Sequence, residues 1–192
     1  MTGGWDVSDR DFALRAQDGD RHAFNQLVLR HKASLYRFVR RYIGNSDDAY
    51  DILQDTFISA WMALRRYDPE RSFATWLRAI ALNKCRDHGR RVSVRQKFLR
   101  LFALEQTVAR APASDATMEH DTPETLRLRR LDEAVAALPG FYKEPLLLTT
   151  VGGLSQQEAA LQLNTTAKAI EMRLRRARLK LAEALSDISG EG

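Results

Sequence analysis

Apolar residues spaced three and four positions apart run through most of the sequence, and this spacing constrains the fold more than any other feature. Between Asp20 and Gly44 the apolar face consists of Phe24, Leu27, Val28, Leu35, Phe38, Val39 and Tyr42. Gly44 then predicts a helix end, because glycine readily takes the left-handed conformation of a helix stop. Alternation of apolar and polar residues never persists, and β-branched residues are scattered. The sequence therefore predicts an all-α protein.

Two further helices are predicted in the first half of the chain. Asp47 and Asp48 favour a helix start, where the helix dipole stabilises negative charge. The apolar face that follows consists of Ile52, Leu53, Phe57, Ala60 and Trp61. After a break at Tyr67-Asp68-Pro69, the segment 71–91 begins with an apolar face of Phe73, Trp76, Leu77 and Ile80.

The composition changes between about residues 103 and 125. Alanine, serine, threonine and proline become frequent there, and the periodicity fades. The segment contains five acidic residues and one basic residue, Arg110. A helix over Leu126–Leu138 follows and stops at Pro139-Gly140. We therefore predict two small helical domains, over residues 1–100 and 129–192, joined by a flexible acidic linker over 101–128.

The segment 154–181 has the spacing of a helix-turn-helix. Ser155 is a good N-cap, and Ala160 is small enough for a second helix to cross closely. Asn164 stands at the turn, where a residue that tolerates positive φ is needed, and Ile170 returns an apolar residue to the core. A basic surface helix in a bundle is the alternative. The spacing and the one-sided charge together favour a second helix that faces a DNA major groove.

The apolar face of the 71–91 helix should continue at positions 83, 84 and 87, but polar residues stand there. They are Asn83, Lys84 and Asp87, and between residues 84 and 100 there are seven Lys or Arg residues and one acid. An amide beside aromatic and cationic groups suits a base drawn out of its stack, with its backbone phosphates nearby. The alternative is that the apolar face drifts onto Ala81 and Cys85 and leaves Asn83 and Asp87 in solvent.

The composition excludes several classes of function. A formal charge of +5 and a pI near 9.6 favour a polyanionic partner. The single cysteine, Cys85, permits no internal disulfide or cysteine-based zinc cluster, and we expect it to be a buried, inert thiol. The four histidines are far apart, and neither a phosphate loop nor an activated nucleophile is evident. We therefore expect no enzymatic activity, cofactor or metal. Without an apolar signal or span, we expect a cytoplasmic protein with no membrane insertion.

Together these motifs resemble RNA polymerase sigma factors of the extracytoplasmic-function group, in the sigma-70 family. The pattern D-x-x-Q-x-T-F-x-x-x-W appears as Asp51, Gln54, Thr56, Phe57 and Trp61. The pattern R-x-F-x-x-W-L-x-x-I-x-x-N runs from Arg71 to Asn83, and R-x-R-R-A-R runs from Arg173 to Arg178. The likeness covers nearly the whole chain. It implies that residues 1–100 hold sigma region 2 and residues 129–192 hold sigma region 4.

The resemblance also implies three sets of contacts. The largest-subunit clamp helices of core polymerase would bind Asp51, Gln54, Asp55 and Phe57. The non-template strand of the −10 element would meet Asn83 and Asp87 near a flipped base, and Lys84, Arg86, Arg90 and Arg91 near phosphates. The −35 duplex would be read by Thr166, Lys168, Glu171, Met172, Arg173, Arg175 and Arg176. Further implied partners are the polymerase flap region and an anti-sigma factor.

Two departures from the family pattern affect the second domain. Asn164 replaces the usual turn glycine. Glu171 and Met172 stand where many relatives have a cation and a small polar residue, so we expect a different −35 sequence, and Glu171 could accept from a cytosine amino group. The alternative function is a helix-turn-helix regulator that binds duplex DNA without core polymerase. It leaves the motifs at 51–61 and 71–91 without a role.

Overall fold

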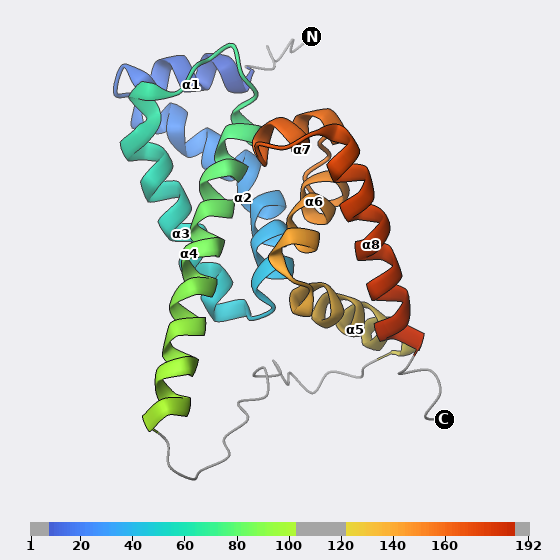
Figure 1. Ribbon diagram of the computed structural model, residues 1–192. Helices are drawn as coiled ribbons and strands as arrows, with labels where there is room; N and C mark the ends of the chain where they lie inside the picture. The colour runs from blue at the N-terminus through green and yellow to red at the C-terminus, as the bar shows by residue number, and fades with distance from the viewer. Residues whose placement is uncertain (1–7, 103–121, 187–192) are drawn as a thin grey trace.

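A computed structural model describes residues 8–102 and 122–186 of the chain. The first range forms α1 (Asp9–Gln17), α2 (Arg21–Ile43), α3 (Ser46–Ala63), the short 3-10 helix η1 (Leu64–Arg66) and α4 (Phe73–Phe102). The second forms α5 (Pro123–Ala137), α6 (Gly140–Thr150), α7 (Gln156–Gln162) and α8 (Ala167–Ser186). Figure 1 shows α1 to α4 gathered on one side and α5 to α8 on the other. Neither described range contains a strand, and the predicted all-α fold with two small helical domains is confirmed.

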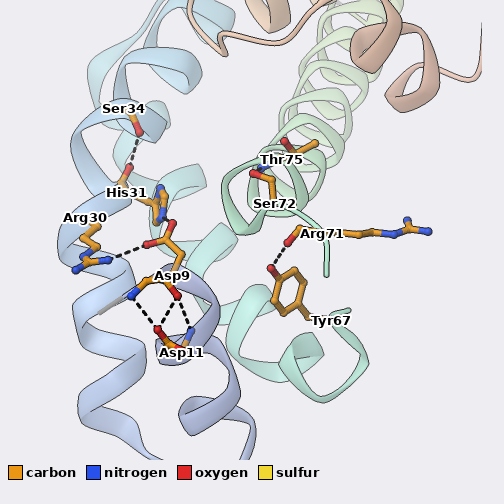
Figure 2. Close-up of polar contacts among 10 residues, drawn as sticks. Asp9, Asp11, Arg30, His31, Ser34, Tyr67, Arg71, Ser72 and Thr75 are labelled. Carbon is orange, nitrogen blue, oxygen red and sulfur yellow. Dashed lines mark hydrogen bonds and ion pairs between the residues drawn. The ribbon is translucent and has the colours of Figure 1, made fainter. Parts of the chain in front are cut away.

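Helix α1 is an element that the apolar spacing does not predict. It begins with a capping box, in which the Asp11 amide donates to Ser8 Oγ at 3.2 Å and the Ser8 amide donates to Asp11 Oδ2 at 3.1 Å. Its buried residues are Phe12, Ala13 and Ala16. Asp9 lies 2.6 Å from His31 Nε2 and accepts from Arg30 at 3.2 Å, which fastens α1 to α2 (Figure 2). The local signal for this helix is the Ser8-x-x-Asp11 spacing.

Local caps define the predicted ends of α2 and α3. Asp20 accepts a hydrogen bond from the Ala23 amide at 3.0 Å and begins α2. Gly44 ends it with a φ of 82°, which confirms the predicted glycine stop. Asn45 then accepts from the Asp48 amide at 2.9 Å and begins α3. With only Gly44 and Asn45 between the two helices, α2 and α3 lie antiparallel and bury their apolar faces against each other.

The buried face of α4 extends beyond Ile80. The residues on this face are Phe73, Leu77, Ala81, Leu82 and Cys85. The alternative in which the apolar face drifts onto Ala81 and Cys85 is therefore confirmed, with Asn83 exposed and Asp87 half-buried. Each step of four residues turns the position by about 40° around a helix of 3.6 residues per turn, so the face drifts onto Ala81 and Cys85. Cys85 is fully buried, which confirms that part of the expectation, and burial raises the pKa of its thiol to about 12.

The second domain packs α8 against α5, α6 and α7. Its core contains Val135, Leu138, Leu146, Leu147, Leu148, Leu154, Ala159, Ala160, Ile170, Leu174 and Ala177. Helix α5 begins at Pro123, so the last residues assigned to the linker are helical. Most of that predicted linker, residues 103–121, lies outside the described residues. None of the helices that the described residues form is both long and apolar enough to cross a lipid bilayer.

Candidate nucleic-acid and polymerase interfaces

Helices α7 and α8 form the predicted helix-turn-helix. The Ser155 amide donates to Glu158 Oε2 at 2.8 Å and the Glu158 amide donates to Ser155 Oγ at 3.2 Å, which closes a capping box at the start of α7. These hydrogen bonds lower the pKa of the Glu158 carboxyl. Asn164 occupies the turn with a φ of 49°, and Ala160 is buried beneath it. The predicted roles of these positions in the turn are confirmed.

One face of α8 packs on the domain and the opposite face is exposed. Ile170, Leu174 and Ala177 point inward and are buried. Of the residues predicted to read the −35 duplex, the exposed ones are Thr166, Lys168, Glu171, Met172, Arg175 and Arg176. Arg178 and Lys180 add exposed positive charge to the same helix. The helix therefore presents a mainly basic outer face of the kind that enters a major groove.

Arg173, the seventh residue of that set, is placed differently. It is half-buried, and its guanidinium carbon lies 3.8 Å from the centroid of the Phe141 ring. One guanidinium nitrogen donates to Thr165 Oγ1 at 3.5 Å, while its Nε is buried without a hydrogen-bond partner. A cation over an aromatic face is stabilised by the ring quadrupole. Arg173 thus joins α8 to the start of α6, through an aromatic partner that helical spacing alone does not reveal.

Helix α4 carries the residues predicted to meet the −10 strand. Asn83, Arg90 and Arg91 are exposed, and Lys84 and Asp87 are half-buried. Arg90 is paired with Asp87 one turn away. Arg86 turns toward the second domain, where it makes two hydrogen bonds to Glu144. The structure therefore brings the six side chains to one stretch of α4, where Arg86 lies at the edge, bonded through Nε and NH2 to Glu144 and through NH1 to Asn83.

A groove of about 350 Å³ separates α3 from α4. Asp48, Asp51, Ile52, Gln54 and Asp55 line its α3 side, and Lys84, Asp87, His88 and Arg91 line its α4 side. His88 Nε2 lies 3.6 Å from Asp48 Oδ2 across the groove. The α3 wall is mainly acidic and the α4 wall mainly basic. Three of the four residues predicted to bind polymerase and three of the six predicted to bind the −10 strand therefore line opposite walls of one groove.

The remaining polymerase-binding candidate, Phe57, is half-buried and packs against the core. The exposed face of α3 instead continues from Asp55 to two apolar residues, Ile58 and Met62, whose exposed fractions are 58% and 79%. Positions four apart lie on the same side of a helix. The signal in the sequence is that Ile58 and Met62 fall outside the apolar face that packs inward.

Comparison with known proteins identifies both domains. The family model described as Sigma-70 region 2 matches residues 27–95, and the model described as Sigma-70, region 4 matches residues 128–181. The chain is 39% identical over 189 residues to the RNA polymerase sigma factor CnrH of Cupriavidus metallidurans, which covers 96% of this chain and 97% of the relative. It is 30% identical over 169 residues to the ECF RNA polymerase sigma factor SigE of Mycolicibacterium smegmatis, covering 88% of this chain and 64% of the relative.

The fold of this chain is similar to that of CnrH in the solved structure of CnrH in complex with the cytosolic domain of CnrY. The TM-score is 0.67 at 35% sequence identity, and the match covers 93% of this chain and 97% of the other. A regulator that acts without polymerase accounts for the match to region 4 but not for the match to region 2. Identity, coverage and fold therefore agree: the chain belongs to the sigma-70 family, as a sigma factor of the extracytoplasmic-function group that directs promoter-specific transcription initiation.

Proposed function

We propose that α3 docks the chain on the clamp helices of core polymerase, that α4 captures the non-template strand of the −10 element, and that α8 reads the −35 duplex. Residues 1–100 then serve docking and −10 recognition, and residues 129–192 serve −35 recognition and contact with the flap region. The observation that carries this proposal is the shared groove between α3 and α4. A polymerase held at Asp51, Gln54 and Asp55 would bring the opened strand directly to Lys84 and Arg91.

The exposed apolar residues of α3 supply the anchor that such docking needs. Protein interfaces gain most of their energy from a few apolar or aromatic side chains surrounded by polar contacts. Ile58 and Met62 lie on the same side of α3 as the exposed Asp51, Gln54 and Asp55. We assign the anchoring role to these two residues rather than to Phe57, whose ring already contributes to the core of the domain.

Replacement of Gln54 by alanine tests the docking surface. The side chain is exposed, so Gln54→Ala should leave the thermal unfolding temperature unchanged. Binding to core polymerase should fall by roughly fivefold, the effect of losing one hydrogen bond of about 1 kcal/mol. Fluorescence titration of labelled protein with core polymerase measures it, and Gln96→Ala, an exposed amide on α4, is the matched control. A lower unfolding temperature with unchanged core affinity would show that position 54 is structural.

An anti-sigma partner is the further proposal. CnrH, which is 35% identical in its solved structure, is seen in complex with the cytosolic domain of CnrY. A protein that covered the exposed faces of α3 and α4 would prevent both polymerase docking and strand capture. Promoter-specific transcription should appear when the purified protein is added to core polymerase on a promoter, which a duplex-binding regulator would not supply. The transcription should fall when such a partner is added as well.

A further inference from the structure

A polar cluster joins the two domains where the end of α2 lies against α5 and α6 (Figure 1), and Arg86 reaches this cluster from the middle of α4. Arg86 Nε donates to Glu144 Oε1 at 2.7 Å, and its NH2 group donates to Oε2 at 2.5 Å. The Tyr42 hydroxyl donates to Glu144 Oε1 at 3.2 Å. Burial, followed by the charge of Glu144, raises the pKa of Tyr42, so that this hydroxyl keeps its proton. The Glu144 side chain is only 13% exposed.

Lys143, the residue before Glu144, is buried at the same joint, with 8% of its surface exposed. Its amine donates to the carbonyl oxygen of Tyr42 at 3.0 Å and also to that of Ala136. These carbonyls belong to the last turns of α2 and α5, where helices leave acceptors unsatisfied and carry partial negative charge. The Lys143 amine therefore donates hydrogen bonds to the C-terminal ends of two helices that belong to different domains.

Two more contacts make the joint specific. Arg41 Nε donates to Asp132 Oδ1 at 3.0 Å, which links α2 to α5. A Cβ atom at Gly44 would lie 2.8 Å from the Cβ of Ala136, so the two backbones approach as closely as glycine permits. Paired charges, a shared cation and close backbone packing all select one arrangement of the two domains.

We infer that the Arg86–Glu144 pair, with Tyr42 and Lys143, is a latch that holds the free protein closed and withholds Arg86 from single-stranded DNA. This inference rests on the proposed function in one respect, the role of Arg86 beside the −10 phosphates. Both oxygens of Glu144 already occupy the guanidinium fork of Arg86. A phosphate group offers the same two-pronged acceptor and would have to displace the carboxylate.

Displacement of Glu144 has a consequence for the domains. A half-buried carboxylate that loses its cation becomes costly, and the cost is relieved when water reaches it. Binding of DNA to Arg86 therefore favours separation of the second domain from the first. The coupling is reciprocal, because whatever separates the domains also makes Arg86 available. Docking on polymerase, which spreads the two domains between the clamp and the flap in the proposed function, would open the latch.

Glu144→Gln in the full chain tests the latch. The variant keeps the size of the side chain and an acceptor for Tyr42 but loses the charge that pairs with Arg86. Its affinity for a fluorescent oligo-dT strand of about twelve nucleotides should rise by roughly tenfold, if the closed form outnumbers the open form by that factor. The matched control is Glu133→Gln on α5, which removes the same charge from a side chain 57% exposed and 3.9 Å from Arg129. It should change this affinity by less than about twofold.

The distance between the two domains tests the latch without DNA. Spin labels at Lys32→Cys on α2 and Ala182→Cys on α8 lie on exposed positions of different domains. The native Cys85 is buried near Lys143 and Glu144, where opening of the joint would expose it, so Cys85→Ala is included in every labelled protein. Pulsed electron paramagnetic resonance should give one narrow distribution of distances between the two labels for the otherwise unchanged protein and for Glu133→Gln. The Glu144→Gln protein should show a broader and longer distribution.

Each outcome has a defined meaning. An unchanged distance distribution in Glu144→Gln overturns the latch, whatever the transcription assays show. A longer distance without a gain in oligo-dT affinity over Glu133→Gln overturns the claim that Arg86 is withheld from DNA. Failure of the proposed function is seen elsewhere, as absence of promoter-specific transcription when the protein is added to core polymerase.

Discussion

Asn83→Ala should leave core binding and closed-complex formation nearly unchanged and reduce open-complex formation by more than about tenfold. The amide is exposed on α4 and lies beside Arg86, whose NH1 group donates to Asn83 Oδ1 at 3.4 Å. If it holds a flipped base, its hydrogen bonds form only after the duplex opens and offset an unstacking cost of a few kcal/mol. Loss of two such bonds of about 1 kcal/mol each accounts for the expected effect.

Permanganate footprinting of the −10 region measures this effect on matched and on pre-opened promoter templates. A template mismatched across the −10 region should recover part of the activity, because the cost of unpairing has been removed. Asn25→Ala, which removes an exposed amide from α2, is the matched control and should open the matched duplex normally. Equal opening by the unchanged protein and by Asn83→Ala on the matched duplex would exclude Asn83 from strand capture.

Arg176→Ala should weaken binding to the −35 duplex by about 1 to 3 kcal/mol if the guanidinium pairs with a base edge. Arg176 is exposed on the outer face of α8, so the substitution should leave the fold intact. Discrimination between −35 sequences at one position should relax. A phosphate contact would behave differently, with a similar loss on all sequences and a salt dependence shallower by roughly one unit. Fluorescence anisotropy on duplex variants at several salt concentrations separates the two contacts.

Two other arginines of α8 serve as references for Arg176. Arg178 is exposed and lies outside the residues predicted to read the −35 duplex, so Arg178→Ala controls for the loss of one positive charge. Arg173→Ala removes the cation above Phe141 and should lower the thermal unfolding temperature. Unchanged affinity and unchanged salt dependence in Arg176→Ala would exclude this residue from the site.

Local signals are the part of the structure that the sequence predicts well. The glycine stop at Gly44, the N-cap Ser155 and the left-handed turn at Asn164 each depend on one residue and its immediate neighbours. The inward face of α8 follows from helical spacing in the same way. Such features are confirmed because the physics that selects them acts over a single turn of helix.

Side-chain partners distant in the chain are the part that spacing does not predict. Arg86 and Glu144 are 58 positions apart, and their pairing depends on how the two domains meet. The stacking of Arg173 on Phe141 also depends on a crossing of helices rather than on a repeat. Phe57 is a different case, because helical spacing places it on the inward face of α3, where the structure has it, and only the family resemblance assigns it to polymerase binding.

The position of Lys143 ties the fraying of two helices together. While its amine holds the carbonyls of Tyr42 and Ala136, the last turn of α2 cannot loosen without removing the amine from the last turn of α5. The two turns should then open as one cooperative unit, with amide hydrogens that exchange at the same rate although more than ninety positions separate them. Once the domains part, the carbonyls of each helix end accept hydrogen bonds from water instead, and the two ends fray independently of each other.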